Sequence, residues 1–443
     1  MSAADAGDGA ISNPPDGAGP AAGPDRRKWL ILGVIAVAQL MVVLDATIVN
    51  IALPSAQRAL GFSTADRQWV VTAYALAFGS LLLFGGRLGD LIGRKTTFLA
   101  GALGFAAASA VGGAATSFGM LVAARAIQGA FGALLAPAAL SILSTTFSDP
   151  KERGKAFGVY GAIVGAGGAI GLTLGGVLTE YLSWRWCLYV NLIFAGLAVT
   201  GAVTLLRRQA PRGRSRLDLP GVALVSASMF CLVYGFSNAA TRNWHTPSTY
   251  GFLAAGVALL ATFAWWQARA AGPLLPPRVV LDRNRGAAYL AVLIVGAGMF
   301  GIFLFLIYYM QQTLGYSPVV SGVAFLPMIA MVVVAANLSN VVLLPRLGPK
   351  PLVTAGMLLA AGSMVWLTRI GLHSDYASAV LGPLMAAGLG FGFTIAPSMN
   401  TGTFGVAPQD AGVASATLNT GQQMGGSIGT SLLNTIFAST VAH

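Results

Sequence analysis

The sequence predicts an all-α polytopic membrane protein, and two observations support this prediction. Of the 443 residues, 56% are hydrophobic and only 9% are charged, whereas a soluble globular domain carries about 25% charged residues. The apolar residues also gather into runs of about 20, the length at which an α-helix crosses a bilayer. We therefore expect the chain to lie in a lipid bilayer, with the glycines inside its apolar runs allowing close helix packing.

Thirteen apolar runs meet this length criterion, and most of the loops between them are short. In chain order, the expected spans are 29–53, 67–86, 96–115, 118–145, 155–179, 185–206, 219–238, 249–269, 286–313, 319–345, 350–370, 377–405 and 411–441. Residues 1–27 precede the first span. They are rich in Ala, Gly, Pro and Asp and lack the apolar core of a signal peptide, so they are expected to form a disordered cytoplasmic tail.

The distribution of positive charge predicts the orientation of the spans. With the amino terminus inside, 20 of the 26 Lys and Arg residues fall on the cytoplasmic side, five fall outside, and Arg125 lies within a span. This asymmetry follows the positive-inside rule. It predicts a multi-pass protein of the cell inner membrane with a cytoplasmic amino terminus. The net charge of +12 is spread in short clusters, which argues against a nucleic-acid partner.

An internal repeat at an offset of about 260 residues divides the chain. The matches are Arg87–Gly89 with Arg346–Gly348, Ala136–Pro137 with Ala396–Pro397, Leu60–Ser63 with Leu314–Ser317, and the glycines 154, 167, 168 and 171 with 412, 425, 426 and 429. Parallel repeats of this kind build many secondary transporters. The repeat predicts two six-helix halves, 28–208 and 274–443, separated by a linker with two additional helices, 209–273. The second half shows five spans, so by this count the last span is missing and His443 ends outside.

Two charged residues lie deep within the expected spans. Asp45 is the only acidic residue well inside one, and Arg125 lies at a similar depth from the outer side. Intramembrane charges are costly, and they mark proton relays and substrate pathways. We therefore predict that Asp45 takes up and releases protons and that Arg125 pairs with it. The alternative is a permanent ion pair that only ties two helices together.

Polar residues within other spans are candidates for lining a substrate cavity. They are Asn50, Tyr74, Gln128, Tyr308, Gln311, Gln312, Asn337, Asn400, Asn419 and Gln422. Gln128 lies one helical turn from Arg125 and is also a candidate partner for the charged pair. With so few charges, such a cavity suits bulky, largely apolar molecules, although helix-to-helix hydrogen bonding would explain any one of these residues equally well.

Glycines mark two further features. A glycine-rich face in the fifth span predicts close helix packing, and sliding if the helices move; it comprises Gly161, Gly165, Gly167, Gly168, Gly171, Gly175 and Gly176.

The loop after the second span is basic and contains Gly86, Arg87, Gly89, Asp90, Gly93, Arg94 and Lys95. Its aspartate is expected to accept from the amino end of a neighbouring helix or to pair with a nearby Arg. The second copy, 347–350, lacks the aspartate and is expected to form a weaker contact.

Four motifs together resemble the fourteen-span drug:proton antiporters of the major facilitator superfamily. They are Leu44–Pro54 in the first span, Gly86–Lys95 after the second, Arg125–Gly129 in the fourth and Trp184–Trp186 before the sixth. The resemblance implies a major facilitator fold, proton-coupled export of drugs, antibiotics or a natural product by alternating access, and a gating role for the loop at Gly86–Lys95. One departure is Leu172, where the antiporter motif of the fifth helix carries proline.

Other functional classes find little support. Gly425–Gly429 fits the hydrolase pattern G-x-S-x-G, but that motif requires a strand–turn–helix elbow, and here it falls within an expected span. The sequence has no metal-ligand spacing and no nucleotide-binding loop. We therefore expect no enzyme, no cofactor, no metal and no use of ATP. The remaining alternative is a transport-silent membrane sensor built on a transporter scaffold.

Overall fold

The computed structural model describes residues 26–63, 66–207, 218–241, 244, 246–371 and 374–441. Within these ranges the regular structure is helical and contains no strand, which confirms the all-α prediction. Residues 1–25 of the expected tail lie outside the described residues, as does His443.

Long helices account for every predicted span. They are α1 Arg26–Leu60, α2 Arg67–Ile92, α3 Arg94–Gly113, α4 Phe118–Thr146, α5 Pro150–Tyr181, α6 Trp186–Leu205, α7 Leu219–Thr241, α8 Pro247–Gln267, α10 Arg283–Tyr308, α11 Pro318–Ala324 with α12 Leu326–Leu338, α14 Pro349–Leu367, α15 Leu381–Thr403 and α16 Ala411–Val441. Shorter elements are α9 Pro277–Val280 and α13 Leu344–Leu347, with π-helical turns at Tyr309–Thr313, Ser339–Leu343 and Tyr376–Val380 and a 3₁₀ turn at Pro408–Asp410. Within the described residues, eleven helices are long and apolar enough to cross a membrane; α5 and α16 are not among them but have span length.

The internal repeat has a structural counterpart at the helix ends. Gly61 follows α1 with φ 68°, and its repeat partner Gly315 has φ 67°. Gly93, between α2 and α3, has φ 96°, and Gly348, between α13 and α14, has φ 75°. Positive φ values are readily adopted only by glycine, so glycines end corresponding helices in the two halves. At the second of these turns the sequence repeat pairs Gly348 with Gly89, whereas the glycine with positive φ in the first half is Gly93.

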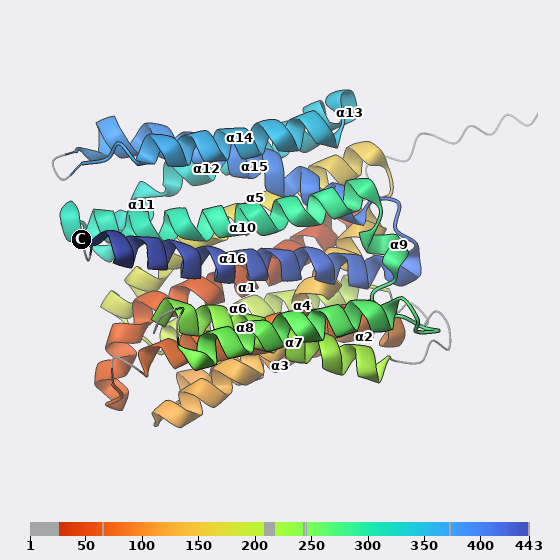
Figure 1. Ribbon diagram of the computed structural model, residues 1–443, viewed down its shortest axis with the longest axis horizontal. Coiled ribbons are helices and arrows are strands. Elements are labelled where there is room, and N and C mark those ends of the chain that lie inside the picture. The colour runs from red at the N-terminus through yellow and green to blue at the C-terminus, as the bar shows by residue number, and fades with distance from the viewer. Residues whose placement is uncertain are drawn as a thin grey trace, which may run out of the picture.

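The helices run side by side along the long axis of the molecule (Figure 1). Helices α1 to α6 form one group and α10 to α16 a second, while α7 and α8 pack on each other and α7 packs against α2 and α16. Where the two groups meet, α5 packs against α1 on one side and against α12 and α15 on the other, and α16 packs against α2. We refer to the end where α1 begins and α2 ends as the basic end, and to the other as the opposite end.

Glycines on α5 allow this helix to lie between the two groups. A side chain at Gly167, Gly171 or Gly175 would collide with α1, and one at Gly161 or Gly176 would collide with the second group. Such close contact between helices requires small residues. Gly168 faces Phe303 of α10. The surroundings of Gly165 and the side chain of Leu172 lie outside what the structure describes.

Asp218 fastens the additional helix pair at the basic end. Its carboxylate accepts hydrogen bonds from Trp266 Nε1 at 2.9 Å, Gln267 Nε2 at 2.7 Å and the Gly221 amide at 2.9 Å. Partial burial opposes ionisation, but these hydrogen bonds outweigh it and lower the pKa of Asp218. Gln267 in turn accepts from the Leu275 amide at 2.9 Å, so the connector after α8 is fixed to the same point.

Gly425→Val tests the close contact between α10 and α16. A side chain at Gly425 would collide with the backbone of Leu293 and Ala297, and overpacking of this kind costs about 1–3 kcal/mol. We expect a lower melting temperature in detergent. Gly196→Val on α6 is the matched control, because nothing lies within 4 Å of a side chain there. Equal melting temperatures for the two variants would contradict the packing described.

Candidate coupling and gating sites

Asp45 lies in the middle of α1 with its side chain fully buried. Its Oδ2 accepts a hydrogen bond from Arg125 Nη1 at 2.6 Å. Its Oδ1 accepts from Gln128 Nε2 at 2.8 Å and from Asn191 Nδ2 at 2.7 Å. Helices α1, α4 and α6 therefore meet at one carboxylate, and the two charges that the sequence singled out are in direct contact.

Arg125 is held by more than its carboxylate partner. Its Nη1 also donates to Gln128 Oε1 at 2.7 Å, and its Nε donates to the Val70 carbonyl at 3.3 Å. The guanidinium carbon lies 4.3 Å from the centroid of the Tyr74 ring, a cation–π contact. The planar guanidinium thus uses several donors in a fixed geometry, which an ammonium group could not reproduce.

Two members of this network were not found by the sequence analysis. Asn191 donates to Ser109 Oγ at 3.0 Å as well as to Asp45, and Gln128 Nε2 donates to the same Oγ at 3.1 Å. Ser109 donates to the Leu188 carbonyl at 2.8 Å. Asn191 is an amide inside an apolar span, the signal used for the cavity candidates, so it could have been included. A serine carries no comparable signal.

The network ties the charge of Asp45 to the packing of five helices, α1, α2, α3, α4 and α6. An ion pair buried in apolar surroundings is held by mutual attraction, and removing one of its charges leaves the other buried without compensation. A proton on Asp45 would leave the positive charge of Arg125 buried without a counter-charge. The site can therefore convert the gain or loss of a proton into a preference for one helix arrangement over another.

At the basic end, Asp90 joins α2 to the start of α16. Its Oδ1 accepts from the Gly412 amide at 3.1 Å, and Arg94 Nη2 lies 3.8 Å from the same oxygen. A side chain at Gly86 would collide with the Gly412 backbone. Both partners expected for Asp90, a helix amino end and an Arg, are present, and the first belongs to the other helix group.

The expected loop at Gly86–Lys95 is mostly helical, and this corrects the sequence analysis. Helix α2 continues to Ile92 and α3 begins at Arg94, so only Gly93 is non-helical. Apolar length was used to end the span at residue 86, but hydrogen bonding carries the helix beyond the apolar run. Gly89 faces Thr97, and Lys95 Nζ donates to the Val203 carbonyl at 2.9 Å and to that of Leu206. Arg87 lines a cavity described below.

A second contact between the helix groups centres on Arg153, near the start of α5. This buried arginine donates from Nε to Asn400 Oδ1 at 2.7 Å and from Nη2 to Thr403 Oγ1 at 2.7 Å. Asn400 in turn donates to Asn340 Oδ1 at 3.2 Å. A side chain at Gly154 would collide with the Asn340 backbone. The second half, which lacks the loop aspartate, is thus held by an arginine from the first half.

The predicted cavity residues that the structure describes take part in different contacts. Tyr74 and Gln128 belong to the Asp45 network. Asn400 belongs to the Arg153 contact, which is the helix-to-helix hydrogen bonding that was the alternative for these residues. Other candidates bond to a carbonyl one turn earlier in their own helix, namely Asn50, Asn337 and Asn419. Gln311 and Gln422 are partly exposed, and the side chains of Tyr308 and Gln312 lie outside the described residues.

A cavity of about 280 Å³ opens at the basic end. Arg87, Asp90 and Leu91 of α2 line one side, and the connector between α8 and α9 lines another. Arg278 of α9 and Asp410 also face it and form an ion pair at 2.9 Å. The connector is therefore joined to the turn that precedes α16, next to the Asp90–Gly412 contact.

Comparison with known proteins agrees with this architecture. The family model of the Major Facilitator Superfamily matches residues 35–430. The puromycin resistance protein of Streptomyces alboniger is 51% identical over 94% of this chain and 82% of its own, and the cephamycin export protein of Amycolatopsis lactamdurans is 40% identical over 91% and 83%. A crystal structure of a human organic anion transporter shares the fold with a TM-score of 0.64 at 15% identity, over 94% of both chains. This chain therefore belongs to the major facilitator superfamily and is a multi-pass membrane transporter.

Proposed function

We propose that the protein is a proton-coupled exporter of bulky, largely apolar small molecules that works by alternating access. The observation that carries the proposal is the buried Asp45–Arg125 pair, with 2.6 Å between Nη1 and Oδ2. The basic end faces the cytoplasm, and the protein lies in the inner membrane with its amino terminus inside. The proton gradient drives export without ATP.

Protonation of Asp45 is the coupling step. With Asp45 ionised, the carboxylate holds Arg125, Gln128 and Asn191 together. When a proton arrives, the attraction between Asp45 and Arg125 is lost, and α1, α4 and α6 favour a different packing. Transport follows if the two packings expose the substrate site to opposite sides of the membrane, because the proton then biases the equilibrium between them.

The contacts at the basic end fit a state closed to the cytoplasm. Asp90 with Gly412 and Arg153 with Asn400 join the two helix groups there. Alternating access requires both contacts to open when the site turns inward. The glycine face of α5 lies at the same boundary, where a smooth contact lets helices slide.

An aminonucleoside antibiotic is the first substrate to test, because the relative that is 51% identical is a puromycin resistance protein. Puromycin is bulky and partly apolar, and such molecules suit a helix bundle that contains few charges. The alternative, a transport-silent sensor, predicts no puromycin export from cells that lack their own pumps. An enzyme is not proposed, because Ser427 lies within α16 and donates to the Gln423 carbonyl one turn earlier.

Asp45→Asn is expected to abolish puromycin uptake driven by a pH gradient in inside-out vesicles. Asparagine keeps the size of the side chain but does not ionise. Puromycin exchange at equal pH reports whether the variant still binds and moves substrate. Gradient-driven uptake equal to that of the wild type would place proton coupling elsewhere.

Arg125→Lys is expected to lose most transport although it keeps the charge. The guanidinium donates to Asp45, Gln128 and the Val70 carbonyl, and an ammonium cannot hold three such partners in that geometry. Export in intact cells, normalised to membrane protein level, measures the effect. Full export activity in this variant would show that transport requires only a positive charge at position 125.

Arg153→Lys is expected to weaken closure at the basic end. The change removes hydrogen bonds from a charged donor, each worth about 1.5–3 kcal/mol, so we expect a lower melting temperature and slower export. Arg346→Lys is the matched control, because Arg346 is an exposed arginine at the same end. An equal decrease in melting temperature and export rate in both variants would indicate a general effect of basic residues.

A further inference from the structure

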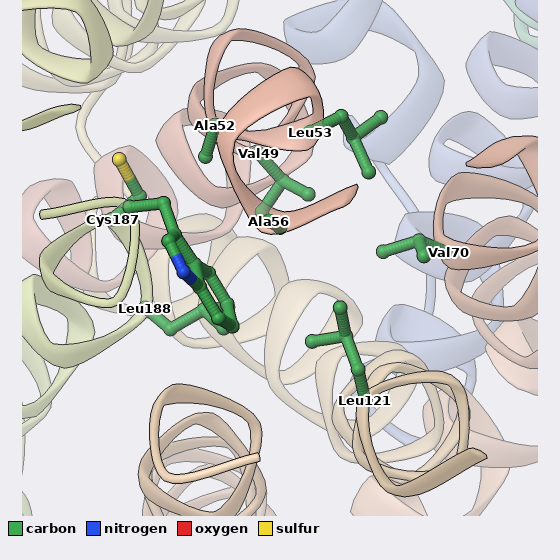
Figure 2. Close-up of a pocket in the computed structure, with 9 residues that line it drawn as sticks. Val49, Ala52, Leu53, Ala56, Val70, Leu121, Cys187 and Leu188 are labelled. Carbon is green, nitrogen blue, oxygen red and sulfur yellow. The ribbon is translucent and has the colours of Figure 1, made fainter. Parts of the chain in front are cut away.

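A narrow apolar gap lies directly beyond the Asp45 network, toward the opposite end. Residues of α1, α2, α4 and the start of α6 line it (Figure 2). The lining residues are Val49, Ala52, Leu53, Ala56, Val70, Leu121, Trp184, Cys187 and Leu188. The free volume is about 10 Å³, room for about one water molecule.

On three helices, the residues that line the gap lie one helical turn from residues of the network. Val49 lies four residues after Asp45 on α1, Leu121 four before Arg125 on α4, and Cys187 four before Asn191 on α6. Four residues make about one helical turn, or about 5.4 Å. Because α1 runs toward the opposite end and α4 and α6 run away from it, all three lining residues lie one turn nearer that end. The gap therefore lies next to the ion pair, one turn nearer the opposite end.

The approach to Asp45 from α5 is blocked by close packing. The neighbouring face of α1 meets α5, where Val43 lies against Gly167 and Thr47 against Gly171. Asp45 itself has no exposed surface. A proton from the boundary between the two helix groups would have to pass this contact, whereas the gap approaches from within the first group.

The network contains two polar atoms, one hydroxyl and one amide oxygen, that water would satisfy. Tyr74 Oη and Asn191 Oδ1 are buried, and neither has a hydrogen-bond partner among the described residues. Buried polar atoms of this kind are commonly satisfied by water. The gap beside them is lined by apolar side chains, and narrow apolar passages stay dry until they widen.

We propose that this gap is the gated entrance through which protons from the outer side reach Asp45. When α1, α4 and α6 separate slightly, water fills the gap and reaches the network. A hydronium ion then gives its proton to a carboxylate oxygen of Asp45, an O–H bond forms, and a water molecule remains. Arg125 keeps its proton, so the pair changes from neutral to a charge of +1. The inference rests on the proposed proton coupling and adds the route.

Ala52→Leu tests the entrance by filling it. In proteoliposomes, we expect loss of puromycin uptake driven by a pH gradient and retention of puromycin exchange at equal pH. Ala59→Leu is the matched control, because Ala59 lies on the same helix, is exposed and is outside the gap. Ala56→Val fills the same gap with a smaller change and replaces Ala52→Leu if that variant does not fold, as judged by its melting temperature.

A compensating variant separates blockage from distortion. Leu121→Ala makes room across the gap, so Ala52→Leu with Leu121→Ala is expected to regain gradient-driven uptake. If folded Ala52→Leu and Ala56→Val take up puromycin like the wild type while Asp45→Asn does not, the entrance is elsewhere and the coupling role of Asp45 stands. If Asp45→Asn also retains uptake, both the entrance and the coupling proposal fail.

Discussion

The buried ion pair between Asp45 and Arg125 is the constraint around which the first half of the protein is arranged. A pair of charges in apolar surroundings is tolerated only when its remaining donors and acceptors are also satisfied. Gln128, Asn191 and the Val70 carbonyl supply those partners from α4, α6 and α2. The helices around the pair must therefore keep a fixed rotation and depth, which generic apolar packing would not impose.

The two halves share a repeat but are latched differently at the basic end. Asp90 reaches the start of α16 from the end of α2. The corresponding second-half segment, at Gly348, carries no aspartate. The second half is held instead by Arg153 of the first half, which donates hydrogen bonds to α15. A carboxylate bound to a backbone amide and a guanidinium bound to side-chain oxygens respond differently to protonation and salt, so the two contacts need not open in the same way.

Apolar length and charge depth predicted the helices and the Asp45–Arg125 contact, because both follow from the cost of polar groups in lipid. The extension of α2 to Ile92 was missed because hydropathy marks where the apolar run ends and not where hydrogen bonding ends. The sequence could not decide between a cavity role and a helix contact for Asn400, because a span position does not reveal which neighbour it faces. Ser109 shows the same limit, since only three-dimensional packing brings its hydroxyl to Gln128 and Asn191.

Helix α5 is the element that connects the coupling site with the basic end. Its glycines lie against α1 at Val43 and Thr47, the residues two positions on either side of Asp45. At its start, the same helix carries Arg153, which holds α15. The side chains of Val43 and Thr47 lie directly against glycines of α5, which have no side chain that could move aside, so a shift of α1 would displace α5. Under the proposed coupling, protonation of Asp45 would therefore be transmitted along α5 to Arg153 and would strain its contact with α15.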